Sequence, residues 1–382
     1  MKKLERLGKG IIDRVLGLVR GPATTGIRID PGQVREVLVV RPHNQMGDML
    51  LSTPMFSALR RGFPKARITL MASPDNYEIM IAHPDVDRCL VFEKKKFRTR
   101  PGDLLGFWRS LRGTRWDVVI MPTTVSFSVT SCIIAWLAGG RVRIGCDGRA
   151  YGRSLGKAVF HIHVPCVWTA EHQTERNLDF TRAAGVTVQS REPVMGLRDE
   201  ERCWARAELE LLRNEGQRLI GIHLGAGKIP NRWPVERFAR IAAALAGSPA
   251  NRVMVMVGPR EEPLVEEIRD HIPNEVMVVS GLSLRQASAF IGELDFFLCN
   301  DTGVMHIGAA LSTPTLALFG PTDPRLWAPL SPALHWLRGE GNRMDSLSVE
   351  QVQGKLQEIL VSLNNPGSSA GECDHASECS SS

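Results

Sequence analysis

Two successive series of short apolar runs, separated by segments of helical spacing, constrain the fold of this chain more than any other feature. The first series has apolar runs at residues 37–40, 67–71, 89–92 and 117–121, with helical spacing at residues 49–61 and 104–112. Strands that alternate with helices predict βαβ units, and therefore an α/β fold with a parallel sheet.

The second series follows residues 145–200, a region with few periodic segments, and begins after a polar helix at about residues 199–213. Its expected strands are 219–224, 252–257, 276–280, 295–299 and 315–319, and its expected helices are 236–246, 263–271, 284–291, 304–311 and 348–363. We therefore predict two Rossmann-like domains, residues 35–200 and 201–364, with a hinge near 195–215. Ligands should bind between them, at the carboxyl ends of both sheets.

Both ends of the chain fall outside these domains. In the N-terminal extension, residues 1–34, apolar residues recur at helical spacing among basic ones between residues 3 and 20. Such a basic amphipathic helix either lies on an anionic membrane surface or packs on the protein itself. The Gly/Ser-rich tail, residues 365–382, is expected to be disordered.

The composition indicates a globular protein of the cytoplasm. Of the 382 residues 43% are hydrophobic and 23% charged, and the formal net charge is only +6, so nothing indicates a nucleic-acid partner. None of the eight cysteines forms a CxxC pair, which favours reduced thiols over disulfides or zinc. No signal peptide is visible. The longest uncharged run, residues 118–140, contains Pro122 and divides into a strand and a helix rather than one transmembrane span.

The loop after the first expected strand contains Gly47 and Asp48. Gly47 permits a ligand to approach the backbone closely. Asp48 opens the next helix at the expected cleft, where a carboxylate has two possible roles. It is either a plain helix cap or a base that deprotonates a substrate hydroxyl, and the position alone leaves both open.

The second series opens with a glycine-rich loop from Gly225 to Lys228. It is not a Walker phosphate loop, because the spacing from Gly221 is one residue too long and Ile229 stands where Ser or Thr should bind magnesium. A glycine-rich turn between a strand and a helix still suits an anionic ligand. Lys228 and Arg232 are the candidate sources of positive charge.

The segment from residue 299 to 310 predicts a second anion site. A strand ends there, Asp301 is expected to cap the next helix, and the free N–H groups of the first turn suit a diphosphate. Because a carboxylate repels a diphosphate, we assign the contact to Thr302 and Gly303, while Asp301 holds the loop. His306 either reaches this site or packs inside the helix.

Two other kinds of chemistry are not indicated. No GxGxxG motif follows the first strand, which argues against a nicotinamide dehydrogenase. The pair Asp85 and Asp87 precedes a strand instead of following one, so we predict no metal site. The helix terminus and basic side chains must then stabilise a leaving diphosphate.

Taken together, these segments resemble the ADP-heptose:lipopolysaccharide heptosyltransferase family, glycosyltransferase family 9. The resemblance runs from about residue 37 to residue 329. It rests on residues 41–54, 63–66, 225–227, 232–234, 300–306 and 318–322.

The resemblance implies a GT-B fold and an inverting enzyme that transfers heptose from ADP-heptose to the inner core of lipopolysaccharide, without a cofactor. Asp48 matches the family's base, and residues 301–303 match its nucleotide-diphosphate loop. Glu262 falls where family members often place an acid that holds the adenosine ribose, although Glu261 is adjacent. Family members often have Lys two residues before the Trp-Pro pair, and this chain has Asn231 there. Either Arg232 or Lys228 supplies that charge, or the donor differs.

The implied acceptor is an anionic glycolipid, so we expect a peripheral protein at the inner face of the inner membrane. A basic cluster in the first domain either binds this acceptor or is simply a solvated face; its candidate residues are Lys94, Lys95, Lys96, Arg98 and Arg100. Two alternatives stay open. One is a family relative that uses another nucleotide-sugar donor or another glycan acceptor, and the other is a non-catalytic glycolipid-binding protein.

Overall fold

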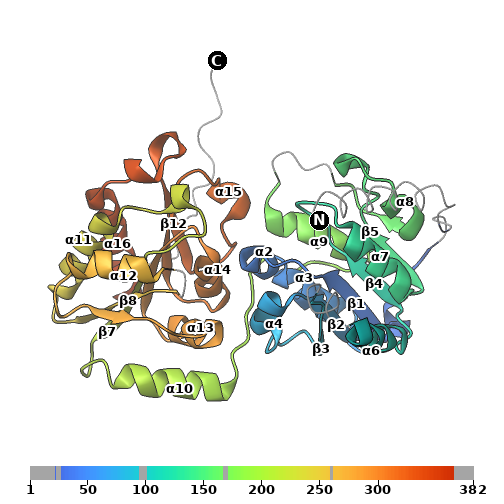
Figure 1. Ribbon diagram of the computed structural model, residues 1–382, viewed down its shortest axis with the longest axis horizontal. Coiled ribbons are helices and arrows are strands. Elements are labelled where there is room, and N and C mark those ends of the chain that lie inside the picture. Colours follow the sequence, from blue (N-terminus) through green and yellow to red (C-terminus); the bar gives the residue numbers. More distant parts are fainter. Residues whose placement is uncertain (1–21, 23–26, 94–100, 167–170, 259–260, 365–382) are drawn as a thin grey trace.

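The protein forms two lobes, each built on one six-stranded parallel sheet (Figure 1). The computed structural model describes residue 22 and residues 27–93, 101–166, 171–258 and 261–364. Most of the N-terminal extension, the whole C-terminal tail and the basic cluster of residues 94–100 therefore lie outside the described residues. The predicted α/β class with two parallel sheets is confirmed.

The sheet of the N-terminal lobe has the order β3-β2-β1-β4-β5-β6, and every pairing in it is parallel. Its strands are β1 (Glu36–Arg41), β2 (Arg67–Ala72), β3 (Arg88–Val91), β4 (Val118–Met121), β5 (Val142–Gly145) and β6 (Ile162–His163). The central strand β1 is buried on both faces because Val37 to Val40 alternate between two helix layers. The strand order reverses between β1 and β4, so ligands are expected at the carboxyl ends of these two strands.

The helices of this lobe are α2 (Met46–Leu50), α3 (Thr53–Gly62), α4 (Pro74–Met80), α6 (Pro101–Arg112), α7 (Val129–Ala138), α8 (Leu155–Val159) and α9 (Gln173–Arg182). The prediction of one helix over residues 49–61 is wrong, because the chain breaks between α2 and α3. The Ser52 hydroxyl donates to the Met49 carbonyl at 2.6 Å, and Pro54 has no N–H with which to continue the helix.

The uncharged run of residues 118–140 divides as expected into β4 and α7. No helix in the part of the chain that the structure describes is both long and apolar enough to cross a bilayer.

The sheet of the C-terminal lobe has the order β12-β11-β10-β7-β8-β9, again with parallel pairings throughout. Its strands are β7 (Arg218–His223), β8 (Asn251–Met256), β9 (Met277–Val279), β10 (Phe296–Asn300), β11 (Thr315–Phe319) and β12 (Leu334–Arg338). Its helices are α10 (Asp199–Glu210), α11 (Val235–Ala246), α12 (Glu262–Arg269), α13 (Leu284–Gly292), α14 (Gly303–Ala310), α15 (Pro324–Trp327) and α16 (Val349–Asn364).

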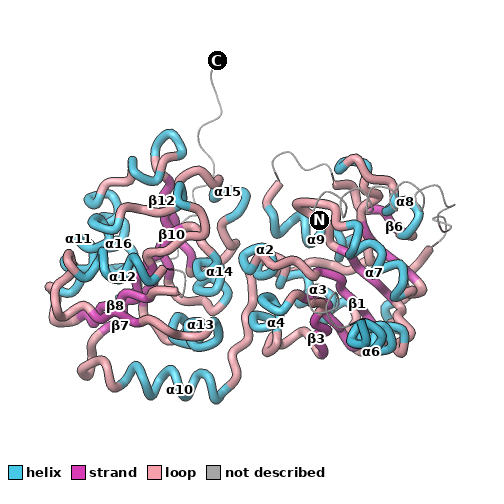
Figure 2. Tube along the Cα trace, viewed as in Figure 1, coloured by secondary structure: helices cyan, strands magenta, loops and turns pink. Residues whose placement is uncertain are grey.

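An extended segment between α9 and α10 carries the chain from one lobe to the other (Figure 2). Helix α10 then packs on the C-terminal lobe, where Trp204 stacks on Phe290 with ring centroids 5.0 Å apart. Arg285 of α13 pairs with Glu201 of α10 and also donates to the Glu78 carbonyl of α4, at 3.1 Å. This buried arginine therefore joins α10, the second sheet's helix layer and the N-terminal lobe.

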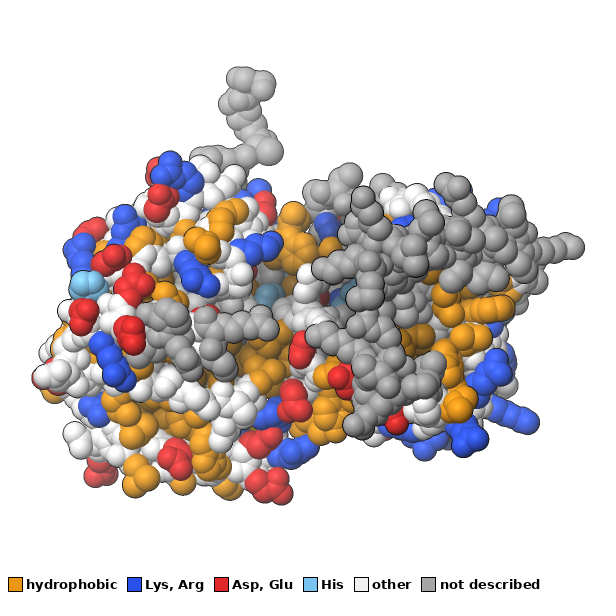
Figure 3. All heavy atoms as spheres, viewed as in Figure 1, with side chains coloured by type: hydrophobic (Ala, Val, Ile, Leu, Met, Phe, Trp, Pro, Cys, Tyr) orange, Lys and Arg blue, Asp and Glu red, His pale blue; other side chains and the backbone are white. Residues whose placement is uncertain are grey.

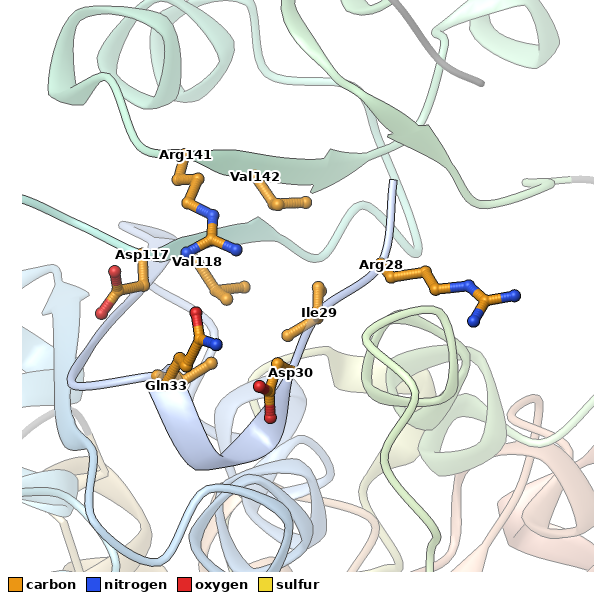
Figure 4. A pocket seen from close by; sticks show the side chains of 9 residues that line it. Arg28, Ile29, Asp30, Gln33, Asp117, Val118, Arg141 and Val142 are labelled. Atoms are coloured by element: carbon orange, nitrogen blue, oxygen red, sulfur yellow. The ribbon is translucent and has the colours of Figure 1, made fainter. Parts of the chain in front are cut away.

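A small hollow of about 10 Å³ lies at the amino-end edge of the first sheet (Figure 4). Residues 28–34 cover it, and the Asp117 carboxylate accepts from the backbone N–H groups of Arg35 and Glu36 at 2.7 and 3.0 Å. A space of that size holds about one water molecule. The large cavities lie at the opposite, carboxyl edge.

Candidate active site

Two cavities open where the carboxyl ends of the two sheets meet. One has a volume of about 760 Å³ and the other about 810 Å³, and Gly227 and Thr302 line both of them. We call the first the apolar cavity and the second the Asp48 cavity. The Asp48 cavity brings together seven candidates from the sequence: Gly47, Asp48, Lys228, Asp301, Thr302, Gly303 and His306.

Helix α2 of the N-terminal lobe contacts helix α14 of the C-terminal lobe through the first turn of each helix. A glycine lies at each point of contact. A Cβ built on Gly47 would lie 2.7 Å from Nε2 of His306, and a Cβ built on Gly303 would overlap the Met46 methyl group. The absence of a side chain at Gly47 therefore admits the His306 ring, whereas the sequence suggested that it admits a ligand.

Asp48 lies in the first turn of α2, but the N-cap of this helix is Gln45. The alternative in which Asp48 is a plain cap is therefore wrong. Burial raises the pKa of the Asp48 carboxyl, although the nearby Arg41 guanidinium acts in the opposite direction. Within the described residues no hydrogen bond reaches this carboxylate, which leaves it available to a ligand in the cavity.

Arg41 fixes the backbone of α2 through hydrogen bonds of its guanidinium. It is almost fully buried, and its Nη2 donates to the Asp48 carbonyl at 3.0 Å while Nη1 donates to Asn177 Oδ1 at 3.1 Å. Asn177 of α9 in turn donates to the Leu51 carbonyl at 3.3 Å. The end of β1, helix α2 and helix α9 thus hold Asp48 in one position.

At the glycine-rich loop after β7, the two predicted cations, Arg232 and Lys228, have different roles. Arg232 Nε donates to the Ala226 carbonyl at 3.0 Å, so this side chain holds the loop. Lys228 lines the Asp48 cavity and lies near Asp301. Lys228 is therefore the cation positioned to meet an anionic ligand.

Asp301 does not cap α14 as predicted, because the N-cap residue is Thr302. Its Oδ2 instead accepts from Asn231 Nδ2 at 2.7 Å, and the same amide nitrogen lies 3.3 Å from Thr322 Oγ1. Burial raises the pKa of Asp301, and hydrogen bonds from Thr322 and Asn231 and the charge of Lys228 oppose that shift. Asn231 thus gives Asp301 a neutral partner that ties three loops together.

His306 satisfies both of its predicted alternatives, since it is buried against Gly47 and also lines the Asp48 cavity. Burial, and then the nearby His172, lower its pKa to about 3, so the ring is neutral near pH 7. Its Nδ1 has no hydrogen-bond partner among the described residues.

The apolar cavity contains a contact between Glu261 and His223 that the sequence analysis did not identify. Glu261 Oε2 lies 3.4 Å from His223 Nε2 and accepts from the Gly258 N–H at 3.0 Å. Burial would raise the pKa of Glu261, but these two contacts and the charge of Arg232 outweigh it and lower the pKa. A Cβ on Gly225 would overlap the Glu261 carboxylate, which explains the need for glycine there.

Glu262, the predicted acid, is the first residue of α12, and its side chain lies outside the described residues. Glu261 is the one that lines the cavity, together with mostly apolar residues such as Met256, Val257 and Leu282. In the sequence, only the adjacency of the two glutamates pointed to Glu261 as an alternative to Glu262.

The fold and the site together define the class of this protein. Two facing parallel α/β lobes, with a carboxylate on one lobe and a cation and helix N-terminus on the other, form a GT-B glycosyltransferase. The profile described as glycosyltransferase family 9 (heptosyltransferase) matches residues 104–357. The chain belongs to this family.

Individual relatives agree with this assignment. Lipopolysaccharide heptosyltransferase 3 of Escherichia coli (strain K12) is 28% identical over 293 residues, which cover 74% of this chain and 82% of the relative. The glycosyl transferase family 9 structure from Veillonella parvula superposes with a TM-score of 0.77 at 22% identity, covering 87% of this chain and 99% of that one. The E. coli heptosyltransferase WaaC with ADP has a TM-score of 0.69 at 20% identity, covering 85% and 99%.

Proposed function

We propose that this chain transfers heptose from ADP-heptose to the inner core of lipopolysaccharide, with inversion at the anomeric carbon. The observation that carries the proposal is the arrangement of the Asp48 cavity, in which Asp48 faces Lys228 and the N-terminus of α14. A base on one wall and diphosphate-stabilising groups on the other are the two parts that glycosyl transfer needs.

The donor is proposed to span both cavities. Its nucleoside occupies the apolar cavity, where the Glu261 carboxylate accepts hydrogen bonds from ribose hydroxyls. Its diphosphate lies at Gly227, Thr302 and Gly303, which adjoin both cavities or the start of α14. The choice of ADP is supported by the related structure that holds ADP.

In the reaction, Asp48 takes the proton of an acceptor hydroxyl as its oxygen bonds to the anomeric carbon. The bond between that carbon and the diphosphate oxygen breaks, and its electron pair leaves with ADP. Attack opposite the leaving group inverts the configuration. Lys228 and the first amides of α14 stabilise the negative charge that develops on the diphosphate, with no metal required.

The acceptor and the location follow from the same proposal. We propose a lipopolysaccharide-type glycolipid as acceptor and a peripheral position at the cytoplasmic face of the inner membrane. Residues 1–34 and the cluster of Lys94, Lys95, Lys96, Arg98 and Arg100 are candidates for these contacts, although they fall almost entirely outside the described residues. The domain limits, 35–200 and 201–364, remain part of the proposal.

One observation favours a second candidate, a family relative with another donor sugar or acceptor. Asn231 occupies the position where the resemblance leads us to expect Lys, and it is engaged with Asp301. Calorimetry with ADP, UDP and GDP, followed by turnover with the matching heptose donors, tests the choice. We expect ADP to bind at least about tenfold more tightly. Preferential binding of UDP or GDP would overturn the ADP-heptose proposal.

A further inference from the structure

Helix α6 presents an apolar residue and two arginines on its outer side. Leu105, Arg109 and Arg112 recur at the three- and four-residue spacing that places them on one helix face. Leu105 is 61% exposed, Arg109 and Arg112 are exposed, and Trp108 is half-buried. On the opposite side Leu111 is buried and Trp108 and Phe107 pack toward the sheet.

Helix α7 continues this surface. The two helices touch at their C-terminal ends, where Arg112 Nε donates to the Leu137 carbonyl at 3.4 Å. Trp136 of α7 is 44% exposed, and Ile133, one turn earlier, is half-buried. Figure 3 shows apolar side chains gathered over α6 and α7, with Lys and Arg side chains beside them.

This surface is rich in arginine. Arg109, Arg112, Arg115 and Arg141 are all exposed, and none of them forms an ion pair within the described residues. We call the surface made by Leu105, Trp136 and these four arginines the α6–α7 face. Arginine and tryptophan beside exposed aliphatic groups suit a boundary between apolar chains and anionic headgroups.

The start of α7 adjoins the Asp48 cavity through one loop. Val125 is 49% exposed and lines the Asp48 cavity, and the same loop leads directly into α7. Helices α6 and α7 also begin at the carboxyl edge of the sheet, because each follows a parallel strand. The starts of α6 and α7 therefore lie on the side of the sheet where the Asp48 cavity opens, whereas Arg112, Trp136 and Arg141 lie toward its amino edge.

We propose that the α6–α7 face docks on the surface of an anionic lipid bilayer. The proposal rests on the proposed function, because docking on a bilayer brings the enzyme to an acceptor that is anchored in lipid. Charge complementarity selects the partner, since the four arginines, which form no ion pair within the described residues, attract anionic headgroups. The exposed Leu105 and Trp136 enter the headgroup region.

The test compares two double variants of the full-length protein. Leu105→Glu/Arg109→Glu alters the face, and Leu211→Glu/Arg269→Glu is its matched control on the C-terminal lobe. Leu211 is 82% exposed and Arg269 is exposed, so the control makes the same change of net charge on a comparable surface. Co-sedimentation is measured with vesicles of phosphatidylcholine alone and with phosphatidylglycerol added.

We expect the face variant to partition onto phosphatidylglycerol vesicles about tenfold more weakly than the control, and salt to weaken binding of the control more than that of the variant. A second variant, Arg115→Ala/Arg141→Ala, should lose several-fold. Equal binding of the face variant and its control overturns the proposal. Transfer to a lipid-free acceptor saccharide is measured in parallel, because its absence from the wild-type protein would overturn the proposed function while the vesicle comparison still judges the face.

Discussion

The imidazole of His306 lies directly against Gly47, so closely that a Cβ at position 47 would stand 2.7 Å from Nε2. The contact joins α14 of the C-terminal lobe to α2 of the N-terminal lobe. Asp48 is the next residue along the chain, and Thr302 and Gly303 begin the helix that carries His306. The distance between the proposed base and the proposed diphosphate site therefore depends on this contact.

Gly47→Ala should separate the two helices and lower kcat by about tenfold to a hundredfold, because misplacement of a catalytic group by about 1 Å costs that much. The affinity for ADP should change little, since the C-terminal lobe carries most of the proposed donor contacts. Steady-state kinetics and calorimetry measure the two effects.

A double variant gives the control for this contact. Gly47→Ala/His306→Ala restores the space that the new methyl group needs, so its kcat should exceed the product expected from the two single variants. If the two single effects simply multiply, the contact between the residues does not set the position of Asp48.

Glu261→Gln should weaken ADP binding by about tenfold or more, because a hydrogen bond to a charged acceptor contributes roughly 1.5–3 kcal/mol. Glu262→Gln is the matched control, since it makes the same change at the next residue, the first of α12. Calorimetry with both variants decides which glutamate holds the ribose. A loss confined to Glu262→Gln would return the role to the residue that the family resemblance suggested.

We expect the protein to lose stability in weak acid because of His83. Burial lowers its pKa to about 4, with Asp85 acting weakly in the opposite direction. Below about pH 6.5 the unfolded chain binds a proton that the folded chain does not, so this ring's share of stability is lost as pH falls from about 6.5 toward 4. Between pH 7 and pH 5 that share is about 2 kcal/mol.

His83→Asn should reduce this pH dependence. The asparagine Oδ1 can accept from the Asp85 N–H in place of His83 Nδ1, which accepts it at 3.1 Å, but it does not titrate. The packing of the ring against Phe56 is lost at every pH and so shifts the whole curve. Urea unfolding at pH 7 and pH 5 measures the difference. An identical loss in both proteins would mean that His83 is protonated in the folded state.

Long buried strands were the most predictable part of this fold. In β1 and β11 the apolar runs are continuous because helices cover both faces of a parallel sheet. The short strand β6 has two residues and the edge strand β12 is half-buried throughout, so neither has a buried face long enough to leave a pattern. Helix α9 was missed because its sequence is mostly polar, although Leu178 and Phe180 are buried.

The candidate site was also only partly predictable from patterns within single segments of the sequence. Sequence position places Asp48, Lys228 and Thr302 at strand ends, and the structure brings all three to one cavity. The partner of Asp301 was missed because Asn231 lies seventy positions away in the chain. Such a pairing depends on how neighbouring loops of the sheet meet, which no spacing within one segment encodes.

Asp48 carries the catalytic proposal and gives the most direct test. An acceptor hydroxyl attacks the anomeric carbon well only if its proton is removed, and a positioned base is typically worth about two to four orders of magnitude in rate. Asp48→Asn keeps the size of the side chain and, because Asp48 is not the N-cap of α2, removes no cap. It should therefore fold, bind ADP with unchanged affinity and lose about a hundredfold or more in kcat.

The pH dependence of the wild-type enzyme gives a second test of Asp48. Burial raises the pKa of Asp48, and the base must be ionised. The value of kcat/KM should therefore fall as the pH is lowered, with a midpoint above the pKa of an ordinary aspartate. The residual activity of Asp48→Asn should lack this acidic limb. Turnover of the variant near the wild-type rate would remove Asp48 as the base, and should the variant unfold, Asp48→Ser provides the same comparison.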